Sequence, residues 1–366
     1  MPIGDSELLL ELRVPSPQLP EDLTVLLDIA AGPYRIVKRS DSMVEFERFD
    51  SYYQGAPAIR RVSIKTFDTP RSAWASLLRG ELDMVYDVPA DAVDFIRNDD
   101  VAVVSVPRAY QYQLVFDLQR GPFKSLQVRK ALNMAVNRAA LIEKALYGNA
   151  EPSAGPLYPK HWAYDSAVPA YSFDPLAASA ILDTAGYPIA RGNRTQAPAR
   201  FRFTCLLPEG FPVWEKVALE VQRDLFNVGV DMQFKVVNLS EFSTRMSSGD
   251  FEAVFVSMSS GPTPSRPYVW WRSARRFKGK NIFGYENEEA ERQFEVLLRS
   301  TNEAAIRSAS SALQRVFHED PPALFIAWDK RARAISRRFN WPTDVDPMFF
   351  LWKWTVTPTH GDTSSQ

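Results

Sequence analysis

The segment that most constrains the fold of this chain runs from Val128 to Gly148. Its apolar side chains recur three and four residues apart, which places them on one face of an α-helix. Lys144 falls in the last turn and Gly148 lies just beyond it, as at a typical helix end. The segment therefore predicts one amphipathic helix packed on a core, with an apolar stripe formed by Val128, Leu132, Ala135, Ala139, Ile142 and Leu146.

Strand-like and helix-like segments alternate along the rest of the chain, which predicts the α/β class. The predicted strands are Tyr34–Lys38, Met43–Arg48, Ile59–Phe67, Leu82–Val85, Val101–Val106, Tyr110–Asp117, Phe201–Leu207, Val230–Val236, Phe251–Ser257 and Ala323–Trp328. The other predicted helices are Pro70–Arg79, Ala90–Ile96, Asp174–Gly186, Val213–Phe226, Glu288–Ser300 and Glu303–His318. A length of 366 residues favours two domains.

Charge and composition exclude several classes of function. The 43 basic and 44 acidic side chains nearly cancel, so no electrostatic footprint for nucleic acid or for a membrane surface is present. The longest apolar runs, such as Ala323–Trp328, are far shorter than the ~20 residues of a membrane span. The single Cys205 cannot form an internal disulfide and is expected to be a buried apolar residue. The first residues, Met1–Ser6, have no signal-peptide pattern, so we expect no signal peptide in this chain.

The sequence contains no pattern that would support catalysis. Its three histidines, His161, His318 and His360, do not have the spacing of metal ligands. Nucleophile-elbow, phosphate-loop and dinucleotide-binding motifs are also absent from the sequence. His318 ends a predicted helix, where a cation would complement the helix dipole. We therefore expect a protein that is not an enzyme and that uses neither a metal nor a cofactor.

Seven short blocks carry a resemblance to a known family. They are Ala31–Val37, Phe49–Pro57, Leu78–Val85, Val128–Gly148, Glu151–Leu157, Phe173–Tyr187 and Phe283–Glu291. Each block is weak by itself and consists mainly of turn glycines and prolines, capping aspartates and helix alanines. In this order, however, they resemble the family 5 extracellular solute-binding proteins, which are the peptide- and nickel-type receptors of ABC importers.

The resemblance implies a type II periplasmic-binding-protein fold, with two lobes, a hinge and an interlobe cleft. Lobe I would comprise residues 31–108 and 329–356, and lobe II residues 109–328. Residues 1–30 would be the remnant of an upstream segment, and residues 357–366 a tail. Relative to the family, the first part of lobe I would be missing, so that the chain is truncated at its N-terminus.

Two departures from the family pattern concern the ligand. Asp117 stands where the family has an asparagine, and the loop Met258–Pro267 carries Arg266 but no carboxylate. Many members have an acidic residue in that loop, and in peptide receptors it pairs with the α-amine of the ligand. A buried ammonium requires a counter-charge. Recognition of a free peptide N-terminus is therefore not expected from this loop.

The candidate ligand-binding residues come from two places in the predicted lobe II. Tyr110, Tyr112 and Phe116 share one face of a strand beside the predicted crossing between the lobes, although core packing would also explain them. The loop supplies the others, which are Met258, Ser259, Arg266, Tyr268, Trp270 and Trp271. Adjacent tryptophans on a regular strand point to opposite faces, so one of them would line the cleft unless both pack under the loop. Arg266 and the basic run Arg272–Lys280 would alternatively be solvated.

Together these features predict the substrate-binding component of an ABC importer that captures a peptide-like or other small polar solute by lobe closure. By resemblance the protein would be periplasmic, or extracellular and lipid-anchored. Its partners would be a small-molecule or oligopeptide ligand and, if it is exported, an ABC permease. We expect a monomer that does not bind nucleic acid. Two alternatives remain open: a ligand-sensing domain of an intracellular regulator, and a truncated relative that does not bind ligand.

Overall fold

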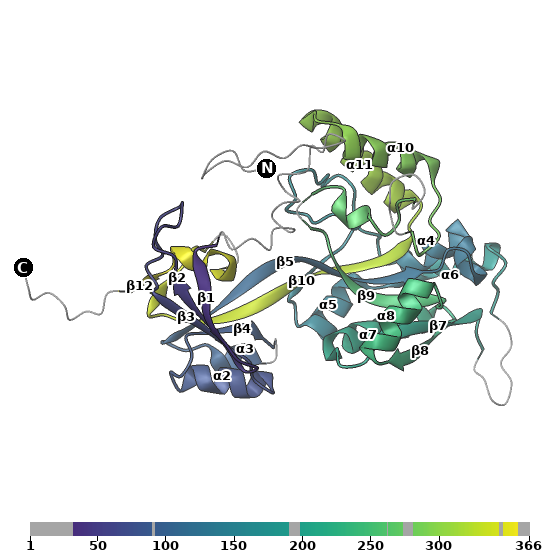
Figure 1. Ribbon diagram of the computed structural model, residues 1–366. Helices are drawn as coiled ribbons and strands as arrows, with labels where there is room; N and C mark the ends of the chain where they lie inside the picture. The colour runs from purple at the N-terminus through teal and green to yellow at the C-terminus, as the bar shows by residue number, and fades with distance from the viewer. Residues whose placement is uncertain are drawn as a thin grey trace, which may run out of the picture. The chain divides into compact units, whose positions relative to one another are not determined.

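The computed structural model describes residues 32–89, 92–189, 198–261, 263–273, 281–343 and 347–357. The described residues form two compact units, one of residues 109–329 and one of residues 32–108 with 330–357. Figure 1 labels their helices and strands. The predicted upstream remnant and the predicted tail after Thr357 lie outside the described residues.

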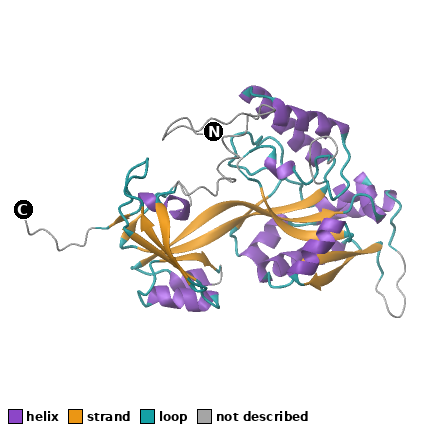
Figure 2. Cartoon of the chain, in the orientation of Figure 1, coloured by secondary structure: helices purple, strands orange, loops and turns teal. Residues whose placement is uncertain are grey.

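The unit of residues 109–329 is built on a mixed sheet (Figure 2). Its strands are β5 (Val101–Phe116), β6 (Ala150–Pro152), β7 (Phe201–Pro208), β8 (Val230–Val237), β9 (Ala253–Ser259) and β10 (Ala323–Ser336). The order is β10-β5-β9-β7-β8, and β6 pairs with β10. Strand β7 runs parallel to β8 and β9, whereas β5 and β9 are antiparallel. Strands β5 and β10 both continue beyond this unit into the other one.

Helices cover both faces of this sheet. They are α4 (Leu126–Ala135), α5 (Arg138–Leu146), α6 (Pro175–Thr184), α7 (Pro212–Asn227), α8 (Leu239–Ser248), α10 (Glu288–Arg299) and α11 (Glu303–Glu319), with short 3₁₀ turns at η2 (Gly121–Lys124) and η3 (Arg266–Tyr268). In Figure 1, α5, α7 and α8 lie on one side of the sheet, and α10 and α11 lie on the other. Trp214 of α7 packs on Phe255 of β9, and Phe317 of α11 packs near Phe325 of β10. The core therefore fills both sides of the sheet.

The segment 128–148 forms two helices, so the prediction of one continuous helix is wrong. Helix α4 ends at Ala135 and α5 begins at Arg138. Between them, the Asn137 side chain accepts a hydrogen bond from Ala140 N, as an N-cap does. The break shifts the apolar stripe, so that Ala139 is exposed although Val128, Leu132, Ala135, Ile142 and Leu146 are buried. Lys144 and Gly148 end α5 as predicted.

Two other predictions have different outcomes. Helix α6 has the predicted punctuation: the Asp174 side chain caps it, Pro175 begins it, and Gly186 follows with φ +91°. In contrast, the two strands predicted at 101–106 and 110–117 are one strand, β5. Residues 107–109 are part of this strand, so the break predicted there is absent.

The second unit contains a three-stranded sheet, a two-stranded sheet of β11 and β12, part of the large mixed sheet, and a small core. Its elements are β1 (Tyr34–Arg39), β2 (Met43–Arg48), β3 (Arg61–Lys65), α2 (Pro70–Leu78), β4 (Met84–Val88), α3 (Val93–Ile96), β11 (Phe339–Asn340), η4 (Pro347–Lys353) and β12 (Thr355–Val356). Strand β4 pairs with the C-terminal half of β10, and β1-β2-β3 form a separate antiparallel sheet. The core lies between α2, α3, β4 and β10, with Leu77, Val85, Ile96 and Ala334 buried in it.

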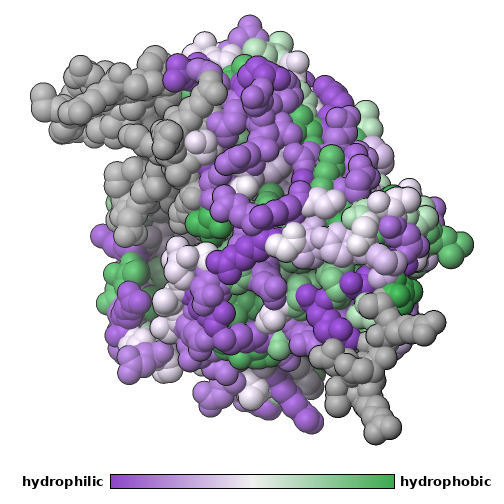
Figure 3. Space-filling view, turned by 90° about the vertical axis from the view of Figure 1, so that its right-hand side faces the viewer, coloured by the Kyte–Doolittle hydropathy of each residue, from purple (hydrophilic) through white to green (hydrophobic). Residues whose placement is uncertain are grey.

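The face drawn in Figure 3 is mostly polar. Figure 3 shows hydrophilic side chains over much of the face seen from the right of Figure 1, with scattered hydrophobic ones between them. Scattered exposed apolar residues are normal for a folded protein. Among the described helices, none combines the length and the apolar composition that crossing a membrane would require.

Candidate functional site

Three of the predicted ligand-binding residues lie together at one end of the β5–β9 pair. Tyr110 of β5 stands opposite Ser259 of β9, and Gln111 stands opposite Met258. Tyr110 is 42% exposed, Ser259 is exposed and Met258 is half-buried. Tyr110 and Ser259 therefore share one face at this end of the pair, and Met258 lies on the opposite face.

Two other predicted residues of the same strand point into the core. Tyr112 and Phe116 are 1% and 0% exposed. The Tyr112 hydroxyl donates a hydrogen bond to Asp329 Oδ1 at 3.2 Å, and the Phe116 ring stacks on Phe123 with centroids 4.6 Å apart. Their surroundings match the core packing that the sequence left open. A direct contact of either side chain with a ligand stays a prediction.

The tryptophan pair follows a helical turn, because η3 leads directly into it. Trp271 N and Arg272 N both donate to Tyr268 O. Trp271 is fully buried, with its ring 5.4 Å from that of Phe317, and the buried Tyr268 ring lies 5.0 Å from Phe317. Trp270 is half-buried and packs against the same core. Trp270 is therefore the more accessible member of the pair, and its contact with a ligand stays a prediction.

The loop between β9 and η3 is held by its own polar groups. Ser259 Oγ accepts a hydrogen bond from Gly261 N, and Arg266 N donates to Thr263 O. Gly261 has φ +71°, and a Cβ added there would lie 2.4 Å from Arg266 Cγ. The aliphatic part of the Arg266 side chain therefore packs against Gly261, and Arg266 as a whole is exposed. Arg266 is the only charged residue in the sequence of the loop Met258–Pro267, and this close approach fixes the position of the first carbons of its side chain.

Buried polar side chains also lie in this loop and along β5, and the sequence did not predict them as site residues. Ser260 Oγ accepts from Tyr158 N, and Ser153 Oγ lies 2.8 Å from Gln111 Oε1. Gln113 is fully buried, and among the described residues neither of its amide atoms has a hydrogen-bond partner. The sequence signal for this polar group was the pair Gln111 and Gln113, which alternate with apolar residues along a buried strand. A buried amide normally has a hydrogen-bond partner, so two of them predict a polar group in the core.

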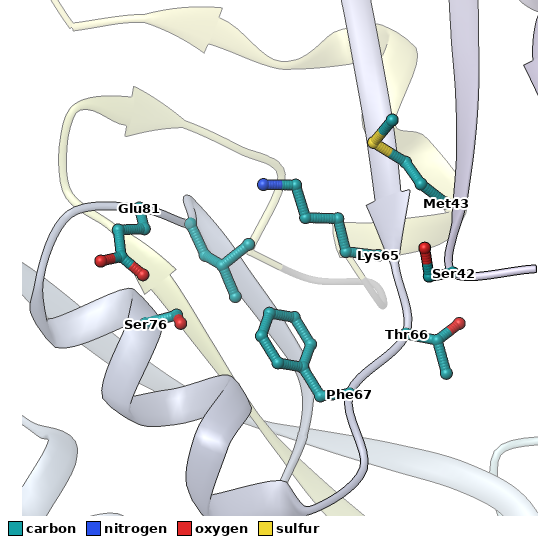
Figure 4. Close-up of a pocket in the computed structure, with 8 residues that line it drawn as sticks. Ser42, Met43, Lys65, Thr66, Phe67, Ser76 and Glu81 are labelled. Atoms are coloured by element: carbon teal, nitrogen blue, oxygen red, sulfur yellow. The ribbon is translucent and has the colours of Figure 1, made fainter. Parts of the chain in front are cut away.

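A separate pocket of about 330 Å³ lies in the unit of residues 32–108, where Figure 4 shows its lining. Apolar atoms come from Met43, Phe67 and Leu82, and charged groups from Lys65 and Glu81. None of these residues was predicted from the sequence as a site residue. They are dispersed over 40 positions and carry no motif, so their proximity depends on the fold.

The single thiol is buried, and the possible metal ligands among the described residues are dispersed. Cys205 is fully buried, and burial raises the pKa of its thiol, so the unreactive protonated form is favoured. Across the described ranges, no three His, Cys, Asp or Glu side chains are grouped as metal ligands would be.

Solved structures identify the fold of this chain. The oligopeptide-binding protein AppA from Bacillus subtilis, in complex with a nonapeptide, aligns with a TM-score of 0.70 and 22% identity over 89% of this chain and 66% of that one. NikA from Brucella suis, in complex with Fe(III)-EDTA, aligns with a TM-score of 0.76 and 21% identity over 89% and 68%. The fold is that of the type II periplasmic binding proteins, as predicted.

The family is established by a sequence model. The model of the bacterial extracellular solute-binding proteins, family 5, middle region, matches residues 27–279. That match covers more than half of the chain, so the chain belongs to this family, as the ordered sequence blocks predicted. The family binds solutes and is not defined by a catalytic activity.

Curated relatives are similar over most of this chain. AppA from Bacillus subtilis is 24% identical over 321 residues, which is 85% of this chain and 59% of AppA. The glutathione-binding protein GsiB from Pectobacterium atrosepticum is 25% identical over 323 residues, 85% of this chain and 61% of GsiB. The chain thus spans about three fifths of the length of these relatives.

Proposed function

We propose that this chain is the substrate-binding component of an ABC importer that captures a peptide-like or other small polar solute by closure of two lobes. The family match over residues 27–279 is the observation that carries this proposal. The names of the relatives add support, since they include oligopeptide-binding and glutathione-binding proteins. The proposed location is periplasmic, or extracellular with a lipid anchor, and the proposed partner is a membrane permease.

The accessible end of the β5–β9 pair is the proposed contact region on the unit of residues 109–329. Accessible side-chain surface in this region and in the adjoining loop comes from Tyr110, Met258, Ser259 and Trp270. Arg266 adds a positive charge. The buried Tyr112, Phe116, Tyr268 and Trp271 would hold these groups in place from the core. A rigid second layer of this kind is what positions a binding site.

The charge of the loop favours a ligand with an anionic or acceptor group. Arg266 provides donors in a planar fork that matches a carboxylate. The loop has no carboxylate of its own, so it supplies no counter-charge for a ligand ammonium. We therefore propose that Arg266 binds a carboxylate or carbonyl of a peptide-like solute.

A thermal-shift screen of the purified chain tests ligand capture. The probes are a tri- to nonapeptide mixture, glutathione and a nickel–histidine complex. A ligand at 100 times its Kd stabilises the folded state by about 2.7 kcal/mol, which shifts the melting temperature measurably. A positive probe is then titrated by calorimetry. If no probe shifts the melting temperature, the binding function is contradicted for this chain.

The proposed site is tested with two matched arginine variants. Arg266→Ala should weaken binding of a positive probe by about tenfold or more, because a charge-assisted hydrogen bond is lost. Arg299→Ala is the control, since its side chain is 69% exposed on α10 and pairs with Glu295 in an exposed bridge. Equal affinities of the two variants would remove Arg266 from the site.

Lobe closure has its own measurement. Small-angle scattering of the chain with and without a bound probe should show a smaller radius of gyration in the complex, because closure makes the particle more compact. Binding without any change in the scattering curve would leave a solute-binding protein that does not close.

A further inference from the structure

We propose that the pocket of the unit of residues 32–108 is a second binding site, which takes a small carboxylate with an apolar tail. It involves none of the residues proposed for the solute site and does not depend on that function. The pocket has a volume of about 330 Å³, at the lower end of the range for small-molecule sites.

The pocket is built from strand ends and a helix end. Met43 of β2 stands opposite Lys65 of β3, and Thr66 N donates to Ser42 O at 2.9 Å. Ser76 lies near the end of α2, and Glu81 follows that helix. Figure 4 shows Lys65 extending from β3 toward the side that carries Ser76 and Glu81, with the Phe67 ring below it. The positive charge thus reaches over an apolar floor.

The charges of the pocket favour an anion. Arg79 donates from Nε and Nη2 to the two oxygens of Glu81, each at 2.8 Å, and its Nη2 also lies 2.9 Å from Ser76 Oγ. This pair neutralises Glu81 within the wall of the pocket. Among the described residues, Lys65 forms no ion pair, so the three charged groups sum to about one positive charge.

The rest of the lining favours a carboxylate that carries an apolar tail over an inorganic anion such as phosphate or sulfate. Lysine provides a compact positive charge for the ligand carboxylate, whereas the hydroxyls of Ser42 and Thr66 line the pocket on the side of β3 away from the Lys65 ammonium (Figure 4). Met43, Phe67 and Leu82 offer apolar surface that a phosphate or sulfate would leave unused. A short branched fatty acid has a carboxylate for the Lys65 ammonium and an apolar tail for the apolar side chains.

Saturation-transfer NMR with isocaproate on the full chain is the direct experiment. Isocaproate should receive magnetisation from the protein, whereas isocaproamide, its neutral isostere, should bind about tenfold more weakly or worse. Inorganic phosphate should not displace isocaproate at equal concentration. Equal binding of the amide, or displacement by phosphate, would overturn the proposal.

Matched lysine variants locate the site. Lys65→Met should lose isocaproate binding by about tenfold or more, whereas Lys38→Met, an exposed lysine of β1 opposite Glu45, should bind as the wild type does. Both variants should keep the wild-type melting temperature, since each lysine is exposed. Phe67→Ala should weaken isocaproate more than acetate.

Failure of this site and failure of the solute site are distinguishable. Arg266→Ala lies in the other unit and should leave isocaproate binding unchanged. If Lys65→Met binds isocaproate like the wild type, or if Arg266→Ala abolishes that binding, the carboxylate does not bind in this pocket. Neither outcome affects the peptide and glutathione screen.

Discussion

The Tyr112 hydroxyl donates a hydrogen bond to Asp329 Oδ1 at 3.2 Å, which joins β5 to β10 across 217 residues of sequence. Both side chains are buried. Tyr112→Phe removes this donor, and we expect the free energy of unfolding to fall by about 1–2 kcal/mol, because a buried carboxylate loses a hydrogen bond. Urea denaturation measures the change. Tyr110→Phe, on the same strand but 42% exposed, should stay within about 0.5 kcal/mol of the wild type. A similar loss in both variants would contradict the assignment.

The two adjacent tryptophans should differ sharply when each is truncated. Trp271 is fully buried among Phe283, Phe317 and Phe325. Trp271→Ala should therefore lower the free energy of unfolding by about 3–5 kcal/mol. Trp270→Ala should cost less than half of that, since Trp270 is only half-buried. Equal losses, measured by the same denaturation experiment, would show that both rings are core residues.

The break between α4 and α5 predicts the effect of a single cap. Asn137→Ala removes the acceptor for Ala140 N, so the free energy of unfolding should fall by about 1 kcal/mol. Asn137→Ser keeps a capping oxygen and should recover most of that loss. If alanine is as stable as asparagine there, the cap does not determine where α5 begins.

The sequence predicted the fold class and most elements, and the misses share a cause. Periodicity over 128–148 cannot report a two-residue break, because Asn137 acts through a hydrogen bond that only the bent chain forms. Similarly, the sequence left open whether one of Trp270 and Trp271 faces outward or both pack under the loop, because it does not show that η3 precedes them and that Trp271 N donates to Tyr268 O. The pocket around Lys65 depends on three elements meeting in space, which no local pattern encodes.

The carboxyl of Glu81 should titrate far below its usual range. Hydrogen bonds from Arg79 lower its pKa to about 2, and Ser76 and Lys65 contribute to the same shift. A lowered pKa in the folded state means that the carboxylate stabilises the fold above its ordinary pKa of about 4.3 and that this contribution disappears as the pH falls toward 2. NMR titration of the wild type and Arg79→Met measures the effect. The Glu81 pKa should rise in the variant, and an unchanged value would show that Arg79 is not its cause.

His318 should make the protein less stable in mild acid. From the sequence, a cation at the end of α11 would complement the helix dipole, but burial lowers the pKa of His318, assisted by the charge of Lys130. Its ring stacks on Tyr171 with centroids 4.6 Å apart. The unfolded chain, with an ordinary pKa of about 6.5, binds a proton that the folded chain does not, so stability falls as the pH decreases through that value. His318→Phe keeps a stacked ring without the titration. Urea midpoints from pH about 7.5 to about 5.5 should therefore fall more for the wild type than for the variant. Parallel pH profiles would mean that the ring is protonated as easily in the folded chain as in the unfolded one.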